Sequence, residues 1–143
     1  LKKVEQGLKS NTEVLEHVAK SLPAIIRAEK VQKKASKVGF DWDSVEEPLN
    51  KIFEEASELK DVYKLQNKAK ILDEMGDLLF AAINTCRFLG IDGEEALNHT
   101  TDKFIKRFSY IERKAKHLGI KLEDMTLKDM DSLWDEAKNL EKN

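Results

Sequence analysis

Apolar residues recur every three or four positions along most of this chain, and this periodicity predicts a series of amphipathic helices. A first helix is expected within residues 3–20, beginning near Thr12. Pro23 suits the first turn of a second helix, which Gly39 ends as a left-handed cap. Every later segment also has the pattern of a helix or a short turn, so the sequence predicts an all-α helical bundle.

The central part of the chain is expected to form a helical hairpin. Ser44 and Glu47 have the spacing of a capping box and predict the start of a helix over residues 45–63. A short polar connection then leads into a helix over residues 68–89, closed by Gly90. Because the connection is short, these two helices are expected to be antiparallel neighbours.

Two further helices complete the pattern. Asp92 is expected to cap a helix over residues 93–117, which Gly119 ends. Thr126 and Asp129 resemble a second capping box, and they predict the start of a last amphipathic helix. No internal repeat, low-complexity run or domain boundary is visible, so the whole chain is interpreted as one domain.

Composition narrows the class of protein. Charged residues make up 36% and the net charge is −2, which is typical of a soluble globular protein and not of a nucleic-acid binder. No apolar run reaches the length needed to cross a bilayer, and the N-terminus has no signal-peptide core, so we expect no membrane partner and a cytoplasmic location. Cys86 is the only cysteine and is expected to be a buried, reduced side chain. Because the first residue is Leu1, we expect the sequence to be part of a longer protein.

Two carboxylate pairs lie on the two helices of the expected hairpin. Glu55 and Glu58 are three residues apart, as are Glu74 and Asp77, so each pair shares one helical face. Two ionised carboxylates roughly 5 Å apart repel by about 3 kcal/mol at an effective dielectric of about 20. If the pairs face each other, a cation is needed between them.

The alternative is that each pair belongs to an ordinary solvated helix face. The second pair favours a metal site, because Glu74 and Asp77 lie in a strongly apolar helix, where acids are rarely tolerated without a partner. Oxygen ligands favour Mg²⁺ or Mn²⁺ over Fe or Zn. A di-iron site would need a Glu-x-x-His pattern, which is absent. The histidines, His17, His99 and His117, are expected to be surface or packing residues.

Basic residues accompany the acids. Lys51 and Lys70 each lie one helical turn before an acid of the two pairs, while Lys103 and Arg107 are four residues apart on a following helix. Mg²⁺ usually bridges carboxylates and substrate phosphates, and phosphates also need cations from the protein. The alternative is a set of ordinary ion pairs worth a few tenths of a kcal/mol each.

Several segments resemble one known family. The sequences EEASE at 54–58 and EMGD at 74–77 fit the pattern EExxE…ExxD, which MazG proteins share with dimeric dUTPases and phosphoribosyl-ATP pyrophosphohydrolases. The segments at 27–42, 73–84 and 103–108 also resemble the C-terminal catalytic domain of the MazG nucleoside triphosphate pyrophosphohydrolases. The resemblance covers nearly the whole chain, so residues 1–143 are interpreted as a single MazG-like domain.

The resemblance implies a dimerising all-α pyrophosphohydrolase in which Glu55, Glu58, Glu74 and Asp77 hold Mg²⁺. Glu54, rotated by about 100° on its helix, either supports these ligands or is solvated. The residues implied to contact the nucleotide are Lys51, Lys70, Lys103, Arg107, Trp134 and Lys138.

Trp134 has two interpretations. Its periodicity alone indicates a core residue, whereas the family match implies an aromatic face that stacks on a base. The second interpretation suits broad base tolerance, since every base has a face to stack on.

The implied reaction converts a nucleoside triphosphate and water into a monophosphate and pyrophosphate, with little base preference, as in house-cleaning of the nucleotide pool. One rival is a base-specific, dUTPase-like hydrolase on the same fold. The other is a non-catalytic helical module for dimerisation or regulation.

Overall fold

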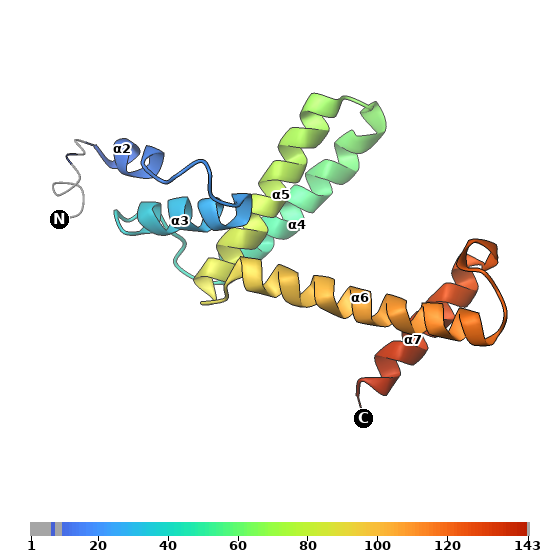
Figure 1. Cartoon of the computed structure of the whole chain (residues 1–143). Coiled ribbons are helices and arrows are strands. Elements are labelled where there is room, and N and C mark those ends of the chain that lie inside the picture. The colour runs from blue at the N-terminus through green and yellow to red at the C-terminus, as the bar shows by residue number, and fades with distance from the viewer. Residues whose placement is uncertain (1–6, 8–9, 143) are drawn as a thin grey trace. The chain divides into compact units, whose positions relative to one another are not determined.

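The computed structural model describes residue 7 and residues 10–142, and every regular element in this part of the chain is a helix, as predicted (Figure 1). The chain forms two compact units, residues 1–94 and 95–143, each with its own internal packing. The elements in chain order are α2 (Asn11–Glu16), α3 (Ala24–Ser36), α4 (Glu46–Val62), the short 3₁₀ helix η1 (Tyr63–Leu65), α5 (Lys68–Phe88), α6 (Gly93–His117), the 3₁₀ helix η2 (Leu122–Asp124) and α7 (Leu127–Leu140).

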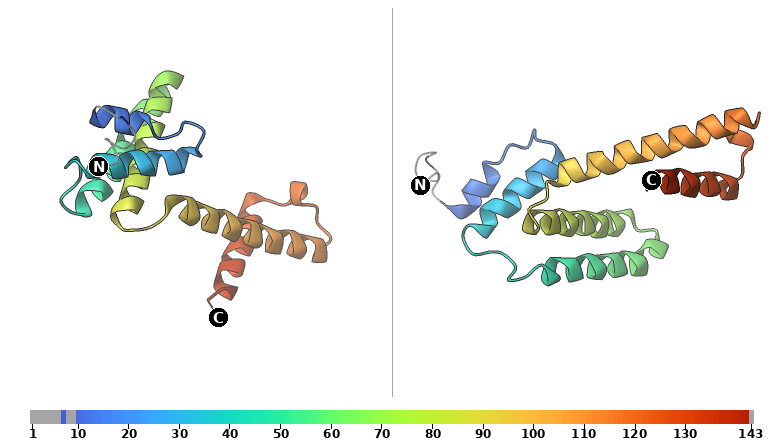
Figure 2. Two further views of the ribbon diagram at one scale, coloured as in Figure 1. Left: turned by 60° about the vertical axis from the view of Figure 1, so that its left-hand side comes forward. Right: turned by 90° about the horizontal axis from the view of Figure 1, so that it is seen from below.

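Helices α4 and α5 form the predicted antiparallel hairpin and lie side by side in each view (Figures 1 and 2). The turn between them needs a left-handed residue, and Gln66 adopts it with φ 56°. Asn67 then caps α5, because its side-chain oxygen accepts a hydrogen bond of 3.2 Å from the backbone N–H of Lys70. This tight turn holds the two acid-bearing helices together.

Helix α3 packs against α5 within the first unit. The Gln32 side chain donates through Nε2 to the carbonyl oxygen of Phe80, at 2.9 Å. Gly93 lies close to both helices, because a Cβ there would lie 3.0 Å from Ile83 and 3.3 Å from Ile25. The beginning of α6 is therefore closely packed on α3 and α5.

One prediction about a helix end is wrong. The Ser44 side chain does not cap α4. The cap position is Val45, without a side-chain hydrogen bond, and Glu47 instead accepts from the backbone N–H of Asp43 at 2.8 Å. The helix begins one residue later than expected, so the reciprocal pair cannot form. The first helix begins at Asn11, close to the predicted Thr12, and ends at Glu16, while the part of that prediction on residues 1–6, 8 and 9 lies outside the described residues.

The second unit contains most of α6 together with η2 and α7. Thr126 caps α7 by accepting from the backbone N–H of Asp129, as predicted. Ile111, Ala115 and Met125 form a buried cluster. The partly buried residues packed against this cluster are Leu122, Met130, Leu133 and Trp134.

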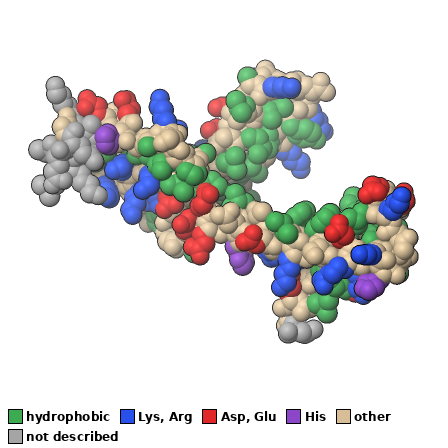
Figure 3. Space-filling model, in the orientation of Figure 1, with side chains coloured by type: hydrophobic (Ala, Val, Ile, Leu, Met, Phe, Trp, Pro, Cys, Tyr) green, Lys and Arg blue, Asp and Glu red, His purple; other side chains and the backbone are tan. Residues whose placement is uncertain are grey.

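Apolar side chains are exposed over the α4–α5 hairpin (Figure 3). Phe53 on α4 is 72% exposed, and Leu72 on α5 is 76% exposed. Among the helices of residue 7 and residues 10–142, none combines the length and the apolar character that a membrane span requires. The three histidines are exposed, as expected, and Cys86 is half-buried.

Candidate metal and nucleotide site

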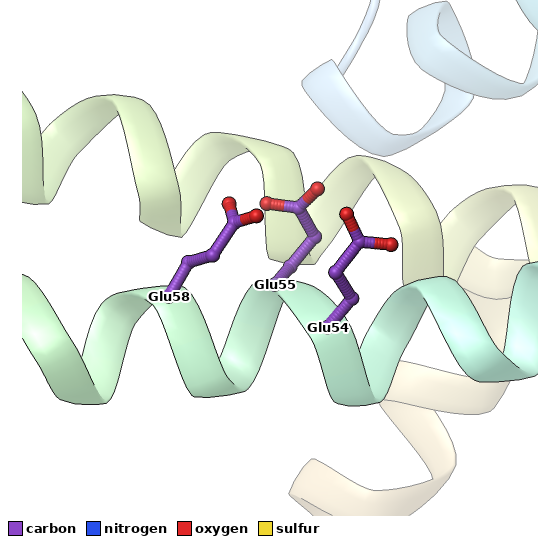
Figure 4. A group of neighbouring side chains, drawn as sticks. All are labelled: Glu54, Glu55 and Glu58. Atoms are coloured by element: carbon purple, nitrogen blue, oxygen red, sulfur yellow. The ribbon is translucent and has the colours of Figure 1, made fainter.

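Helix α4 presents three carboxyl groups on one side, from Glu54, Glu55 and Glu58 (Figure 4). Each offers an oxygen within 4.8 Å of the others, a spacing that one metal ion could bridge. Glu55 is 3% exposed, and its Oε1 lies 3.0 Å from the ammonium of Lys51, one helical turn earlier. Lys51 also lies 3.3 Å from Glu54. A single ammonium therefore serves two carboxylates.

Helix α5 completes the group from the other side of the hairpin. Glu55, Glu74 and Asp77 each offer an oxygen within 4.8 Å of the others, and Glu74 also hydrogen-bonds to Glu58. The four acids expected to form the site are thus brought together from two helices, with Glu55 common to both groups. Glu54 joins them as a fifth carboxyl, although its rotation on the helix left its role open.

The proximity of these acids affects their protonation. Burial and the neighbouring carboxyls of Glu58, Glu55 and Asp77 raise the pKa of Glu74 from 4.5 to about 7. Glu74 is therefore about half protonated near neutral pH. A divalent cation would offset the repulsion between these carboxylates in place of the proton, so the proton would be released when the cation binds.

Two oxygens in the cluster support a fit to a metal ion. The Oε2 atoms of Glu55 and Glu74 are buried and have no hydrogen-bond partner within residue 7 and residues 10–142. Buried carboxylate oxygens normally have partners, so two such atoms in one cluster are unusual. An oxygen-seeking cation such as Mg²⁺ or Mn²⁺ matches this donor set, because every donor is a carboxylate.

A cavity of about 570 Å³ adjoins the acids inside the first unit. Its lining includes Lys51, Glu55 and Asp77, and also Gln32 and Trp42. Its volume is within the usual range for small-molecule sites. The cavity thus connects the acid cluster with an aromatic and amide-bearing surface.

An ion pair fixes the loop that carries the aromatic residues. Arg87 on α5 contacts Asp41 with Nη2 and Oδ1 2.5 Å apart, and its Nε donates to Asn84 Oδ1 at 2.9 Å. The guanidinium holds the pKa of Asp41 below its ordinary value. Asp41 directly precedes Trp42, so this ion pair ties the backbone of the loop next to Trp42 to α5.

The predicted nucleotide contacts on α6 and α7 belong to the second unit. Arg107 is buried, donates to Glu141 at 2.7 Å, and lies 5.2 Å from the ring centre of Trp134. Trp134 is partly buried and also contacts Phe104. The packing agrees with a core role for Trp134 and leaves the stacking role open. Lys138 is exposed, Lys103 is half-buried, and Lys70 on α5 is exposed.

Sequence reasoning gave no role to Gln32, Asn84 or the Asp41–Arg87 pair. A signal for Gln32 was present, since it falls on the same helical face as Ile25, seven positions earlier, where a polar residue is unusual. The ion pair joins residues 46 positions apart and leaves no comparable periodic pattern.

The chain is similar to proteins of one family. The family model described as the MazG nucleotide pyrophosphohydrolase domain matches residues 43–111. The protein named nucleoside triphosphate pyrophosphohydrolase in Escherichia coli (strain K12) is 36% identical over 145 residues, covering 99% of this chain and 54% of that protein. The protein named nucleoside triphosphate pyrophosphohydrolase/pyrophosphatase MazG in Thermotoga maritima is 37% identical, covering 96% of this chain and 52% of that protein.

A further relative is longer. The protein named uncharacterized protein YabN in Bacillus subtilis (strain 168) is 48% identical over 143 residues, covering 99% of this chain and 29% of that protein. The chain thus spans about half the length of the first two relatives and less of the third.

Proposed function

Since the chain belongs to the MazG family, we propose that it hydrolyses nucleoside triphosphates to nucleoside monophosphates and pyrophosphate. Water attacks the α-phosphorus, the bond from this phosphorus to the α–β bridging oxygen breaks, and pyrophosphate leaves. The observation that carries the proposal is the group of Glu55, Glu74 and Asp77, whose oxygens approach within 4.8 Å, beside a cavity of about 570 Å³. The names of the relatives in Escherichia coli and Thermotoga maritima agree with this reaction.

We propose Glu55, Glu58, Glu74 and Asp77 as ligands of Mg²⁺, with Mn²⁺ as a substitute. The bound ion would supply a Lewis acid for the phosphate oxygens. The carboxylates of α4 and α5 would hold the ion. Glu54 supports them through Lys51, which it shares with Glu55.

The proposed nucleotide contacts are the basic residues that the family resemblance implies, together with Trp134. Lys51 lines the cavity, so its ammonium can approach a phosphate there once a cation satisfies Glu55. Arg107 would exchange its contact with Glu141 for a phosphate oxygen. The full proposed set is Lys51, Lys70, Lys103, Arg107, Trp134 and Lys138. The five basic residues of this set would offset the negative charge that develops on the leaving pyrophosphate.

The exposed apolar side chains of the α4–α5 hairpin support a homodimer as a further proposal. Phe53 and Leu72 lie on the two helices of the hairpin, and burying both against a second copy would remove a large apolar surface from water. Light scattering after size-exclusion chromatography tests it, since a monomer at micromolar concentration would contradict it.

The expected location is the cytoplasm, where nucleotide pools lie.

Pyrophosphate release over the eight common ribo- and deoxyribonucleoside triphosphates, with and without EDTA, tests the proposed function. We expect release from several nucleotides that depends on Mg²⁺. Activity on one base alone would favour a base-specific hydrolase, and no release from any nucleotide would favour a non-catalytic module. Asp77→Asn should abolish release while the protein stays helical by circular dichroism, and turnover retained in this variant would exclude the acid cluster from the reaction.

A further inference from the structure

We propose that the cavity beside the acid cluster binds the nucleobase of the substrate, and that Gln32 Oε1 accepts a hydrogen bond from an N–H group on the edge of the base. The inference rests on the proposed function, because it takes the substrate to be a nucleotide. It assigns a role to a side chain that neither the acids nor the basic residues explain.

The orientation of the Gln32 amide is fixed by its partner. Gln32 donates to the carbonyl oxygen of Phe80 at 2.9 Å, and a carbonyl oxygen can only accept. The atom facing Phe80 is therefore the amide nitrogen, and the amide oxygen faces elsewhere. Gln32 Oε1 is thus a fixed acceptor whose position is set by the packing of α3 on α5.

This acceptor is buried and unsatisfied. Gln32 is 6% exposed, lines the cavity, and its Oε1 has no hydrogen-bond partner in the described part of the chain. A buried amide oxygen without a partner destabilises the folded protein, so its retention at a cavity wall favours a ligand that donates to it.

The rest of the cavity suits a flat heterocycle attached to phosphates. Phe40 and Trp42 line it with aromatic surface on which a base can stack, and Glu55 and Asp77 of the acid cluster also line it. A nucleotide uses both kinds of lining, because it has an apolar ring at one end and anionic, metal-binding oxygens at the other. The cavity therefore matches a base whose phosphates reach the acids.

Asn84 adds a donor to this surface. Its side chain lines the cavity on α5, one helical turn after Phe80, and its Oδ1 already accepts from Arg87 Nε at 2.9 Å. The remaining hydrogen-bonding capacity of this amide is mainly that of a donor. Gln32 and Asn84 together provide an acceptor and a donor, which complement the mixed pattern on a base edge.

An acceptor of this kind is compatible with broad base use. Adenine and cytosine carry amino groups, and guanine, uracil and thymine carry ring N–H groups, so each natural base can donate to Gln32 Oε1. A base without an N–H donor on that edge should be rejected. Purine riboside triphosphate, which is ATP without the amino group, is such a probe.

The first experiment compares kcat/KM for ATP and purine riboside triphosphate in the wild-type chain and in Gln32→Leu. We expect a preference for ATP of about tenfold in the wild type, the usual effect of one hydrogen bond, and a ratio within about twofold in Gln32→Leu. Lys33→Leu, an exposed position on the same helix, is the control and should keep the wild-type preference. No preference in the wild type, or a preference that persists in Gln32→Leu, would overturn the assignment.

Trp134→Ala separates the two candidate base sites. If the base stacks on Trp134 and not in the cavity, Trp134→Ala should raise KM for every nucleotide while Gln32→Leu leaves the ATP preference unchanged. That result would overturn the inference.

A binding measurement keeps the inference testable if Gln32→Leu does not fold or if the chain does not hydrolyse nucleotides. Wild-type protein is titrated with AMP and with purine riboside monophosphate while the NMR signals of the Gln32 amide and the Trp42 indole are followed. Shifts of both signals with AMP, and weaker ones with the analogue, support the base site even where absent turnover refutes the proposed function. Equal affinity for the two ligands, or unchanged signals, would overturn it.

Discussion

In the α4–α5 hairpin, carboxyl groups lie against one another, whereas on α6 and α7 the charged side chains lie against opposite charges or hydroxyls. Glu55 and Glu74 each have a buried oxygen with no partner in the described residues. In the second unit, Glu141 pairs with Arg107 at 2.7 Å, and Glu136 pairs with Lys114 at 3.5 Å and accepts from Tyr110.

The pKa shifts follow this division. Neighbouring acids and burial raise the pKa of Glu74 to about 7, while hydrogen bonds from Arg107 and Tyr110 lower the pKa values of Glu141 and Glu136. The folded first unit therefore favours the protonated or metal-bound form of Glu74. The folded second unit favours the ionised forms of Glu136 and Glu141. Acids that cost stability in the absence of a cation are typical of a binding site, and paired acids are typical of structural support.

The largest expected effect is that of Glu74→Gln. Pyrophosphate release should fall by at least about 100-fold, because a carboxylate of the proposed metal site is lost. The melting temperature in EDTA at pH 8 should rise, because Glu74 is ionised there and the substitution removes a like charge from the cluster. Glu136→Gln makes the same chemical change in the second unit and should leave release close to the wild-type rate.

Pyrophosphate release at the wild-type rate in Glu74→Gln would show that Glu74 is not needed for the reaction, and the acids of the hairpin would then not differ in function from those of the second unit. A melting temperature in EDTA that falls by as much as in Glu136→Gln would show that Glu74 is a structural acid like those of α7.

The pH dependence of stability without metal is the second prediction. Between the ordinary value of 4.5 and about 7, folded Glu74 keeps a proton that the unfolded chain has released. Stability should therefore decline as the pH rises through this window, and the full loss should be present above about pH 7. Melting temperatures in EDTA at pH 5, 6, 7 and 8 measure it.

Two controls identify the group responsible for this decline. Glu74→Gln should flatten it, and Mg²⁺ at pH 8 should restore the stability lost by ionisation. If the decline persists in Glu74→Gln, another group causes it.

Much of this site was predictable because its acids have helical spacing. The separation of Glu55 from Glu58 and of Glu74 from Asp77 places each pair on one face, and the short turn at Gln66 and Asn67 makes the two helices neighbours. Helix periodicity and turn length are local properties of the sequence. The hairpin and the meeting of its acids could therefore be inferred without coordinates.

The cavity could not be inferred in the same way, because it depends on contacts between distant segments. The pair of Asp41 and Arg87 joins residues 46 positions apart, and the orientation of Gln32 depends on a carbonyl 48 positions away. The wrong cap at Ser44 has a local cause, since a shift of one residue at a helix start is enough to exchange the partners of Glu47.

Glu141→Gln examines whether the paired charges of the second unit are purely structural. The substitution removes the counter-ion that holds Arg107, so Arg107 becomes available to a phosphate under the proposed function. We expect KM for a triphosphate to fall about two- to fivefold, the effect of a weak competing ion pair, with kcat unchanged. Initial rates over a range of ATP concentrations measure both constants.

Arg107→Lys is the companion variant, because it keeps the charge and loses the forked contact with Glu141. If Glu141→Gln leaves KM unchanged and lowers the melting temperature, Arg107 and Glu141 form a structural pair. All the paired acids compared in the second unit would then be structural.

The smallest effect is expected for Lys114→Ala. Lys114 and Glu136 are 43% and 48% exposed, with the ammonium 3.5 Å from the carboxylate, so solvent and salt screen their attraction. The melting temperature should change by less than about 2 °C, and 0.5 M NaCl, an ionic strength at which screening extends only about 5 Å, should remove the difference from the wild type. Differential scanning calorimetry at low and high salt measures it. A loss several times larger at both salt concentrations would mean that this surface pair stabilises the α6–α7 unit much as a buried one would. The acids of the second unit would then stabilise the fold strongly, whereas the acids of the hairpin destabilise it in the absence of a cation.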